Sequence, residues 1–372
     1  MVNEFKVPFV NLNIQHSLLK KDLYNAFERV INDSSFIQGK EVKSFEDNFC
    51  RVFDVKNCIS CANGTDALYI SLKSLNLKPE DEVITTALSW ISTSEAISHA
   101  GGKITFCDID ENSFCINTDL IESLVNKNTV GILPVHIYGQ PCEMTKIKEI
   151  AKKYNLWIIE DCAQAHLAKY QKSFVGKHGI ASTFSFYPSK NLGAIGDAGC
   201  ISTSNYEMAK WMRSFSNHGR KNIHEIEGIN SRLDGLQASI LNVKIKYLKE
   251  WTKRRIKLAN YYIKNLQGVG DLILPIKQKN TEHVYHLFTI RTKKRDELNE
   301  FLRNNGIGTS INYPTPLPLL ECYKSRFTNS ENFSVALKVC REIISIPIYP
   351  ELTEKLQNHV IETIKNFYKN NS

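Results

Sequence analysis

The sequence lacks any long run of apolar residues. Its longest apolar stretches, such as Leu156-Trp-Ile-Ile159, are far shorter than the roughly 18 consecutive residues that a membrane-spanning helix needs. The first residues, Met1-Val-Asn-Glu-Phe-Lys6, lack the apolar core of a secretory signal peptide. Internal repeats and low-complexity segments are also absent. We therefore expect a globular, cytoplasmic protein that does not associate with membranes.

The sequence also lacks the cysteine spacing of a disulfide framework or a metal site. Its ten cysteines are scattered, and several lie in runs that are typical of buried strands. Cys58-Ile-Ser-Cys61 is the only CxxC pair. A zinc site would need a second Cys/His pair beside it, and a redox pair would have to open a helix. We expect free thiols that pack as small apolar side chains in a reducing compartment, and no metal.

Positive charge is present but uneven. The 47 Lys and Arg exceed the 39 Asp and Glu by 8, and residues 244–295 alone hold 14 basic residues against three acidic ones. Such a stretch suits a nucleic acid, a phosphorylated small molecule or a solvated helix face. The last is favoured, because the interleaved aromatic and Arg residues of a nucleic-acid module are missing. One buried helical stripe runs between the lysines at steps of three to four: Leu236, Ile240, Val243, Tyr247, Trp251.

The order of the predicted elements indicates an α/β protein. Helices alternate with short apolar strands, as in a largely parallel sheet flanked by helices, and strands are predicted at 82–85, 103–107, 132–137, 156–159 and 183–186. After a long helix that starts near Arg232, the pattern changes to an α+β unit with strands at 284–290 and 343–348. The length, 372 residues, allows about two domains. We predict a large domain over 1–250 and a smaller C-terminal domain over 251–372.

Two residues with catalytic potential lie near the ends of neighbouring predicted strands. Asp161 closes the strand at 156–159, which presents a carboxylate against an apolar core. Lys190 follows the strand at 183–186 among apolar neighbours, where partial desolvation would lower its pKa and favour Schiff-base chemistry. A helix cap and a surface lysine are the simpler readings of each residue alone.

Three further segments suit a phosphate and an aromatic ring. Gly64 and Thr65 stand where a strand turns into a helix, and the free N–H groups of a first helical turn bind anions. Ser185 precedes Lys190, and Trp90 lies beyond the strand at 82–85. An ordinary N-cap and a core tryptophan remain the alternatives. Taken together with a carboxylate and an amine, these groups match one ligand, pyridoxal 5′-phosphate (PLP).

The sequence resembles the sugar aminotransferases of the DegT/DnrJ/EryC1/StrS family, which have the fold-type I architecture of PLP enzymes. The resemblance covers most of the chain. The matching segments are Phe36-Ile-Gln-Gly39 with Phe45-Glu46, Asn63-Gly-Thr-Asp-Ala-Leu68, Asp81-Glu-Val-Ile84, Pro134-Val-His-Ile-Tyr-Gly-Gln140, Glu160-Asp-Cys-Ala-Gln-Ala-His166, Phe184-Ser-Phe-Tyr-Pro-Ser-Lys-Asn-Leu-Gly193 with Gly196-Asp-Ala-Gly199, and Gly228-Ile-Asn-Ser-Arg-Leu-Asp234 with Leu236-Gln-Ala238.

The resemblance implies a role for each matching residue. Lys190 would form the Schiff base with PLP, and Asp161 would pair with the ring nitrogen. Gln164 would lie against the 3′-oxygen. The phosphate would be held by Ser185 and by the Gly64-Thr65 backbone, with Trp90 stacked on the ring. Asn230 would reach the phosphate of the neighbouring subunit, which implies a homodimer with shared active sites. Tyr313 matches a segment near the sugar nucleotide. Separately, the negative charge of a nucleotide diphosphate makes Arg220, Lys221 and Arg232 candidate partners, with solvated loop charge as the alternative.

The implied reaction is transamination of a nucleotide-linked keto-6-deoxyhexose at C-3 or C-4. The resemblance suggests dTDP as the nucleotide, L-glutamate as the amino donor, pyridoxamine phosphate (PMP) as the intermediate form of the cofactor, and O-antigen or a related polysaccharide as the destination. Three departures occur: Leu167 and Lys172 replace glycines, which predicts a reshaped loop, and Asn312 replaces a frequent His. Two alternatives stay open, a PLP-dependent sugar dehydratase, which would have His in place of Lys190, and a non-catalytic regulator that binds nucleic acid.

Overall fold

The structure is a computed structural model that describes residues 5–220, 223–327 and 330–370. Its centre is a seven-stranded sheet in the order β1-β9-β8-β5-β4-β2-β3. Strand β9 runs antiparallel to both of its neighbours, and every other adjacent pair is parallel. The strands are β1 (Asn57–Cys61), β2 (Glu82–Thr86), β3 (Lys103–Cys107), β4 (Thr129–Leu133), β5 (Trp157–Asp161), β8 (Ala181–Ser185) and β9 (Gly199–Thr203). The predicted α/β class with a mixed, mostly parallel sheet is confirmed.

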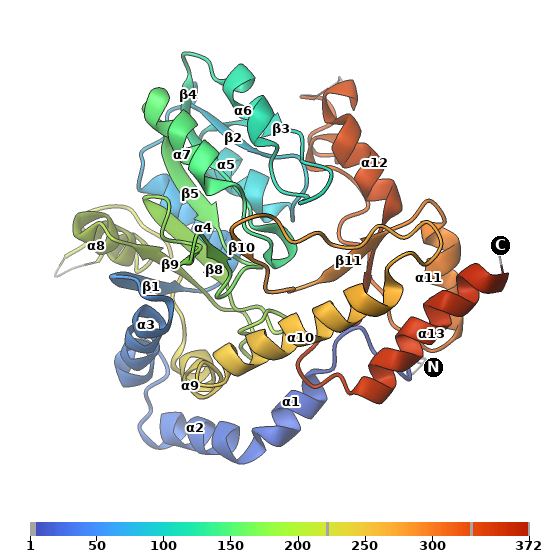
Figure 1. Cartoon of the computed structure of the whole chain (residues 1–372). Coiled ribbons are helices and arrows are strands. Elements are labelled where there is room, and N and C mark those ends of the chain that lie inside the picture. Colours follow the sequence, from blue (N-terminus) through green and yellow to red (C-terminus); the bar gives the residue numbers. More distant parts are fainter. Residues whose placement is uncertain (1–4, 221–222, 328–329, 371–372) are drawn as a thin grey trace.

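Helices flank this sheet (Figure 1). Almost every strand residue is buried, as expected for a sheet that is covered on both faces. Helix α4 packs on β8 and β9, and α7 packs on β4 and β5. The helices along this part of the chain are α1 (Leu12–Leu18), α2 (Lys20–Asn32), α3 (Gly39–Phe53), α4 (Gly64–Lys73), α5 (Ser92–Ala100), α6 (Thr118–Leu124), α7 (Met144–Lys153), α8 (Tyr206–Phe215) and α9 (Gly235–Lys244).

The C-terminal part forms a second hydrophobic cluster. Helix α10 runs from below the sheet toward α13 (Figure 1), and Val7 near the N-terminus joins the cluster. Its elements are α10 (Leu248–Leu266), α11 (Arg295–Asn304), α13 (Glu354–Asn370) and the antiparallel pair β11 (Phe288–Arg291) with β12 (Ile343–Ile346). Helix α12 (Ser334–Glu342) instead packs on the core of the large sheet. The domain boundary near residue 250 stays a proposal. A small three-stranded sheet contains β6 (Lys169–Tyr170), β7 (Ser173–Phe174) and β10 (Thr281–Glu282).

The long helix predicted from Arg232 onward is wrong in one respect. The apolar stripe from Leu236 to Trp251 belongs to two helices, α9 and α10, which are separated at Ile245–Tyr247. The predicted strand at 284–290 begins only at Phe288. Both errors have one cause: periodicity identifies the buried face of a segment but not the point at which the backbone turns.

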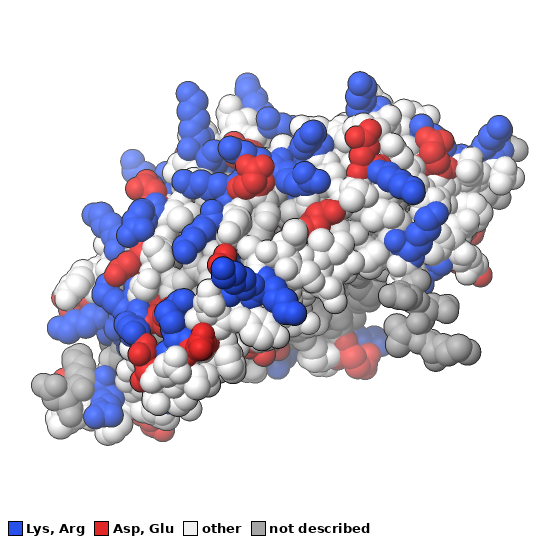
Figure 2. Space-filling model, turned by 90° about the horizontal axis from the view of Figure 1, so that it is seen from below, with Lys and Arg blue, Asp and Glu red and all other residues white. Residues whose placement is uncertain are grey.

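The basic stretch of residues 244–295 does not gather into one patch. Lys249, Lys253 and Lys257 are exposed along α10, whereas Lys244 and Arg255 are buried. Figure 2 views the molecule from below and shows Lys and Arg side chains spread over that face, with Asp and Glu among them. No helix in the described part of the chain is long and apolar enough to cross a membrane.

Candidate active site

The polar residues of the site gather at one edge of the large sheet because parallel strands end together there. Asp161 is the last residue of β5, and its side chain is buried. Its Oδ1 accepts the N–H of Ala163 at 3.1 Å, and its Oδ2 accepts the hydroxyl of Thr93 at 3.0 Å. Burial raises the pKa of Asp161, while these two donors and the positive charge of Lys190 oppose the rise.

Lys190 lies in the loop of residues 186–194, hereafter the Lys190 loop. The Ala194 N–H donates to the Phe186 carbonyl at 2.7 Å, and the Lys190 N–H donates to the Tyr187 carbonyl at 2.8 Å. These hydrogen bonds close the loop at its base and tighten its turn. Burial lowers the pKa of Lys190 to about 8, against the attraction of the Asp161 carboxylate. A larger share of this amine is therefore neutral, and nucleophilic, near neutral pH than for an exposed lysine.

The first turn of α4 meets the end of β8. Asn63 caps this helix by accepting the Asp66 N–H at 2.8 Å. A Cβ atom on Gly64 would lie only 2.7 Å from the Cβ of Ser185, so only glycine allows this close approach. The Thr65 hydroxyl lies 2.7 Å from that of Ser92. Unpaired N–H groups of a helical turn beside a serine hydroxyl form a suitable binding site for a phosphate.

Gln164 connects the sheet edge to a segment far along the chain. Its Oε1 accepts the Tyr138 N–H at 2.7 Å, and its Nε2 donates to the Tyr313 hydroxyl at 3.1 Å. The two hydrogen bonds fix the orientation of the amide. The rings of Tyr313 and Trp90 lie 5.7 Å apart between centroids, at an interplanar angle of 45°. Trp90 is 58% exposed, so the core-tryptophan reading is wrong and an aromatic face is available to a ligand.

The candidate nucleotide residues lie on a separate loop. Asn230 is exposed and forms a backbone bridge with Asn217, whose side-chain Oδ1 accepts a hydrogen bond from Arg232 at 3.0 Å. Arg220 is exposed. Lys221 lies outside the described residues. Ser231, next to Asn230, donates its hydroxyl to Asp66 in the first turn of α4 at 2.6 Å, so this loop lies beside that turn within the single chain.

Two of the departures from the family pattern lie where the backbone has positive φ angles. Leu167 and Lys172 have φ angles of 64° and 68°, in the left-handed region that glycine favours. The backbone therefore keeps a glycine-like conformation at both positions. The Asn312 carbonyl accepts the Tyr138 hydroxyl, while its own Oδ1 is buried without a partner among the described residues.

A buried acid behind Asp161 was not singled out from the sequence. Glu160 accepts the N–H groups of Gly176, His178 and Gly179 at 2.7–2.8 Å and lies 3.1 Å from His136 Nε2. Burial alone would raise the pKa of Glu160, but His136 and the backbone donors keep it below its usual value. Cys142 donates its N–H to His136 Nδ1, so the ring proton lies on Nε2 and is donated to Glu160.

The surroundings of Glu160 also contain one group of possible metal ligands. His136, Glu160 and Cys162 are near enough to one another to hold an ion. The imidazole and the carboxylate are already engaged with each other and with backbone N–H groups. We interpret the group as a brace for the end of β5. Neither Glu160 nor Thr93 belongs to a motif that points to its role. The sequence shows only that Glu160 lies beside Asp161 and that Thr93 lies near Trp90.

Comparison with known proteins identifies the chain. A profile described as the DegT/DnrJ/EryC1/StrS aminotransferase family matches residues 17–365. The chain belongs to this family. It is 42% identical over 98% of its length to a "Pleiotropic regulatory protein" from Geobacillus stearothermophilus, covering 99% of that protein. It is 37% identical over 97% of its length to "dTDP-3-amino-3,6-dideoxy-alpha-D-galactopyranose transaminase" from Aneurinibacillus thermoaerophilus, with 99% of the relative covered.

Solved structures agree with this assignment. The crystal structure of DesV from S. venezuelae superimposes with a TM-score of 0.95, at 34% identity over 98% of each chain. NtdA from Bacillus subtilis, solved with bound PMP, gives a TM-score of 0.89 at 32% identity, covering 98% of this chain and 85% of NtdA. The protein is therefore a PLP-dependent aminotransferase, as the resemblance implied.

The residues of this chain fit that cofactor. The Gly64–Ser185 approach leaves no room for a side chain beside the first turn of α4, which suits a bound phosphate. A buried carboxylate, a partly buried lysine of lowered pKa and an exposed indole complete the donor set that a protonated pyridine ring and an aldehyde require.

Proposed function

We propose that this aminotransferase moves the amino group of L-glutamate to the keto carbon of a nucleotide-linked 6-deoxyhexose. The observation that carries the proposal is that Asp161 ends β5, while the Lys190 loop follows the adjacent parallel strand β8 near enough for the two charges to act on each other, beside the first turn of α4. Lys190 also disfavours the dehydratase alternative, in which histidine would occupy this position.

The position of amination that we propose is C-3. The resemblance alone left C-3 and C-4 open. Several relatives have names that specify amination at C-3 of dTDP- or UDP-linked sugars. One relative is named as acting on 3-oxo-glucose-6-phosphate, which supports a sugar phosphate without a nucleotide as the second candidate substrate. The resulting amino sugar would serve the synthesis of O-antigen or a related polysaccharide.

Each residue of the site has a proposed role in this reaction. When bound, PLP supplies the electron sink for the carbanion at the α-carbon of the donor. Lys190 Nζ takes the proton from that α-carbon and returns a proton to the sugar carbon in the second half-reaction. Asp161 holds a proton at the ring nitrogen. Gln164 binds the 3′-oxygen, and Trp90 covers one ring face.

The phosphate is assigned to backbone and hydroxyl donors. Gly64, Thr65 and Ser185 would bind it through the first turn of α4 and the end of β8. Tyr313 would contact the sugar nucleotide, since it lies against Trp90 and Gln164. Arg220, Lys221 and Arg232 remain candidates for the diphosphate, as charge-assisted partners.

A homodimer would bring Asn230 to the active site of the neighbouring subunit. Large apolar side chains are exposed near the site and along α2, and a monomer would leave them in water. They include Tyr24, Phe27, Ile31, Phe36, Ile37, Tyr187 and Ile195. A second subunit would cover them and would supply Asn230 to the cofactor phosphate.

The test of this proposal is a substrate panel. Purified protein with PLP and L-glutamate is mixed with 3-keto and 4-keto nucleotide sugars and with a 3-keto sugar phosphate, and products are identified by mass and NMR. We expect a 3-amino nucleotide sugar. Amination of only the 4-keto sugars would contradict the C-3 assignment. Full turnover by Lys190→Ala would overturn the assigned mechanism, and DNA binding with no cofactor absorbance would favour the regulator alternative.

A further inference from the structure

Lys244 is a fully buried lysine next to the Lys190 loop. It is the last residue of α9, and none of its surface is exposed. Its Nζ donates to the Gly193 carbonyl at 2.8 Å and lies 3.0 Å from His16 Nε2 on α1. An ammonium group is costly to bury and is retained where it is paired and hydrogen-bonded. Both named contacts of Nζ reach segments far from α9 in the sequence.

The Gly193 carbonyl has little freedom of its own. A Cβ on Gly193 would lie 2.2 Å from the Pro188 carbonyl oxygen, so the two sides of the loop are in direct backbone contact. Leu192 is buried, and the side chain of Asn191 lies 3.3 Å from His286 Nδ1. Anchoring Gly193 therefore anchors the loop three residues after Lys190, at the peptide unit whose N–H, that of Ala194, closes the loop on Phe186.

The charged and titratable groups around Lys244 are compatible with its hydrogen bond to the Gly193 carbonyl. Burial lowers the pKa of Lys244 to about 8, and the Glu351 carboxylate opposes that change. Burial and the Lys244 charge lower the pKa of His16, so its imidazole is neutral and can accept a hydrogen bond from the ammonium. Gln15, next to His16, donates to Glu351 at 3.4 Å. The N-terminal helix thus reaches Lys244 through His16 and the loop before α13 through Gln15.

We propose that Lys244 is a positioning residue that sets the Lys190 amine in place through the Gly193 carbonyl. The inference rests on the proposed function, in which Lys190 binds the cofactor. Lys244 itself would touch neither cofactor nor substrate. Displacement of a catalytic group by about 1 Å can reduce turnover up to a hundredfold without a comparable change in substrate binding.

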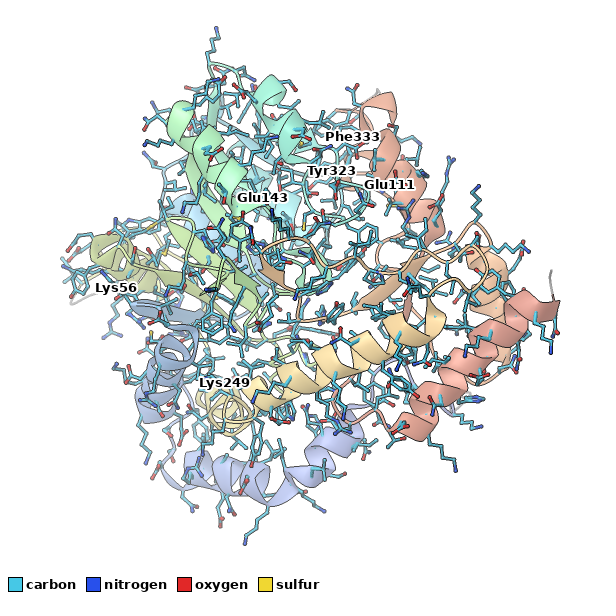
Figure 3. The ribbon with its side chains drawn as sticks, in the orientation of Figure 1. Lys56, Glu111, Glu143, Lys249, Tyr323 and Phe333 are labelled. Carbon is cyan, nitrogen blue, oxygen red and sulfur yellow. The ribbon has the colours of Figure 1, made fainter. Side chains whose placement is uncertain are left out.

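The experiment compares Lys244→Met with Lys249→Met in the PLP-loaded enzyme. Lys249 is exposed near the start of α10 (Figure 3), and its replacement removes the same charge from the surface. Borohydride reduction of the wild-type holoenzyme, followed by peptide mapping, first establishes whether the cofactor is on Lys190. Label on another lysine would overturn the proposed function itself, separately from the role of Lys244.

The measured quantities are PLP affinity by fluorescence titration and the glutamate half-reaction by absorbance. For Lys244→Met we expect kcat to fall about tenfold or more, KM for glutamate to change less than about threefold, and the PLP Kd to rise. Lys249→Met should match wild type. A folded Lys244→Met protein with wild-type kcat and PLP Kd would overturn the inference.

A second variant covers a folding failure. Lys244→Gln keeps an N–H donor for the Gly193 carbonyl and should fall between wild type and Lys244→Met; equality with Lys244→Met would overturn the hydrogen-bond argument. If circular dichroism shows that neither variant folds, a crystal structure of the wild-type holoenzyme decides. A Nζ to carbonyl distance within about 3.2 Å supports the inference, and one beyond about 4 Å overturns it.

Discussion

Replacement of Lys190 by methionine should stabilise the apoprotein at neutral pH. Burial moves the pKa of Lys190 from 10.5 to about 8, a difference of about 2.5 units. At about 1.4 kcal/mol per unit, keeping this lysine charged costs at most about 3.5 kcal/mol of folding free energy. The side chain is partly exposed, so we expect a gain of about 1–3 kcal/mol after solvent screening. Methionine has a similar length and no charge.

The stability gained by Lys190→Met should depend on pH. The folded-state pKa is the lower one, so the cost is fully present below about pH 8 and disappears as pH rises through the unfolded value of 10.5. Urea unfolding of both apoproteins at pH 7 and above pH 10.5, at one protein concentration, measures the difference. Lys56→Met, an exposed position labelled in Figure 3, is the matched control. Equal stability at pH 7, or a gain that persists unchanged at high pH, would refute the reasoning.

Three other changes test the surroundings of the site. Thr93→Val removes a donor to the Asp161 carboxylate and should raise its pKa further, so the acidic limb of the pH–rate profile shifts to higher pH; an unmoved limb would contradict this. Gly64→Ala places a methyl group against Ser185 and should raise the PLP Kd about tenfold or more in a fluorescence titration, and an unchanged Kd would be the contrary result. Glu160→Gln should lower the free energy of unfolding by about 3 kcal/mol, seen as a clear fall in Tm, because the buried backbone N–H groups that donate to Glu160 lose their carboxylate partner. An unaltered Tm would disprove the stabilising role of Glu160 at the end of β5.

Much of the site could be predicted because its parts are local in sequence. The strand predicted at 103–107 matches β3, and the strand predicted at 156–159 matches β5 within a few residues. Asp161 and Ser185 each end a strand, and adjacent parallel strands end at one edge. Chemistry that depends on the ends of strands is therefore readable from apolar runs and the polar residues that follow them.

The rest depends on contacts between distant segments. The hydrogen bonds of Gln164 to Tyr138 and Tyr313 join three separate parts of the chain, and no local pattern announces them. The same holds for Lys244, which the sequence placed on a solvated helix face. Spacing shows which residues share a face, but not which distant backbone carbonyl a buried ammonium reaches.

The placement of β9 between β1 and β8 has a consequence for biosynthesis. Within the large sheet β1 pairs only with β9, which ends 142 residues later, at Thr203 compared with Cys61. At about 5–20 residues per second, a nascent chain leaves β1 without its neighbour for roughly 7–28 s. Cys58 and Cys61 on this strand stay open to oxidants and to other growing chains for that interval. A chaperone that shields the unpaired strand during that interval would therefore limit such encounters.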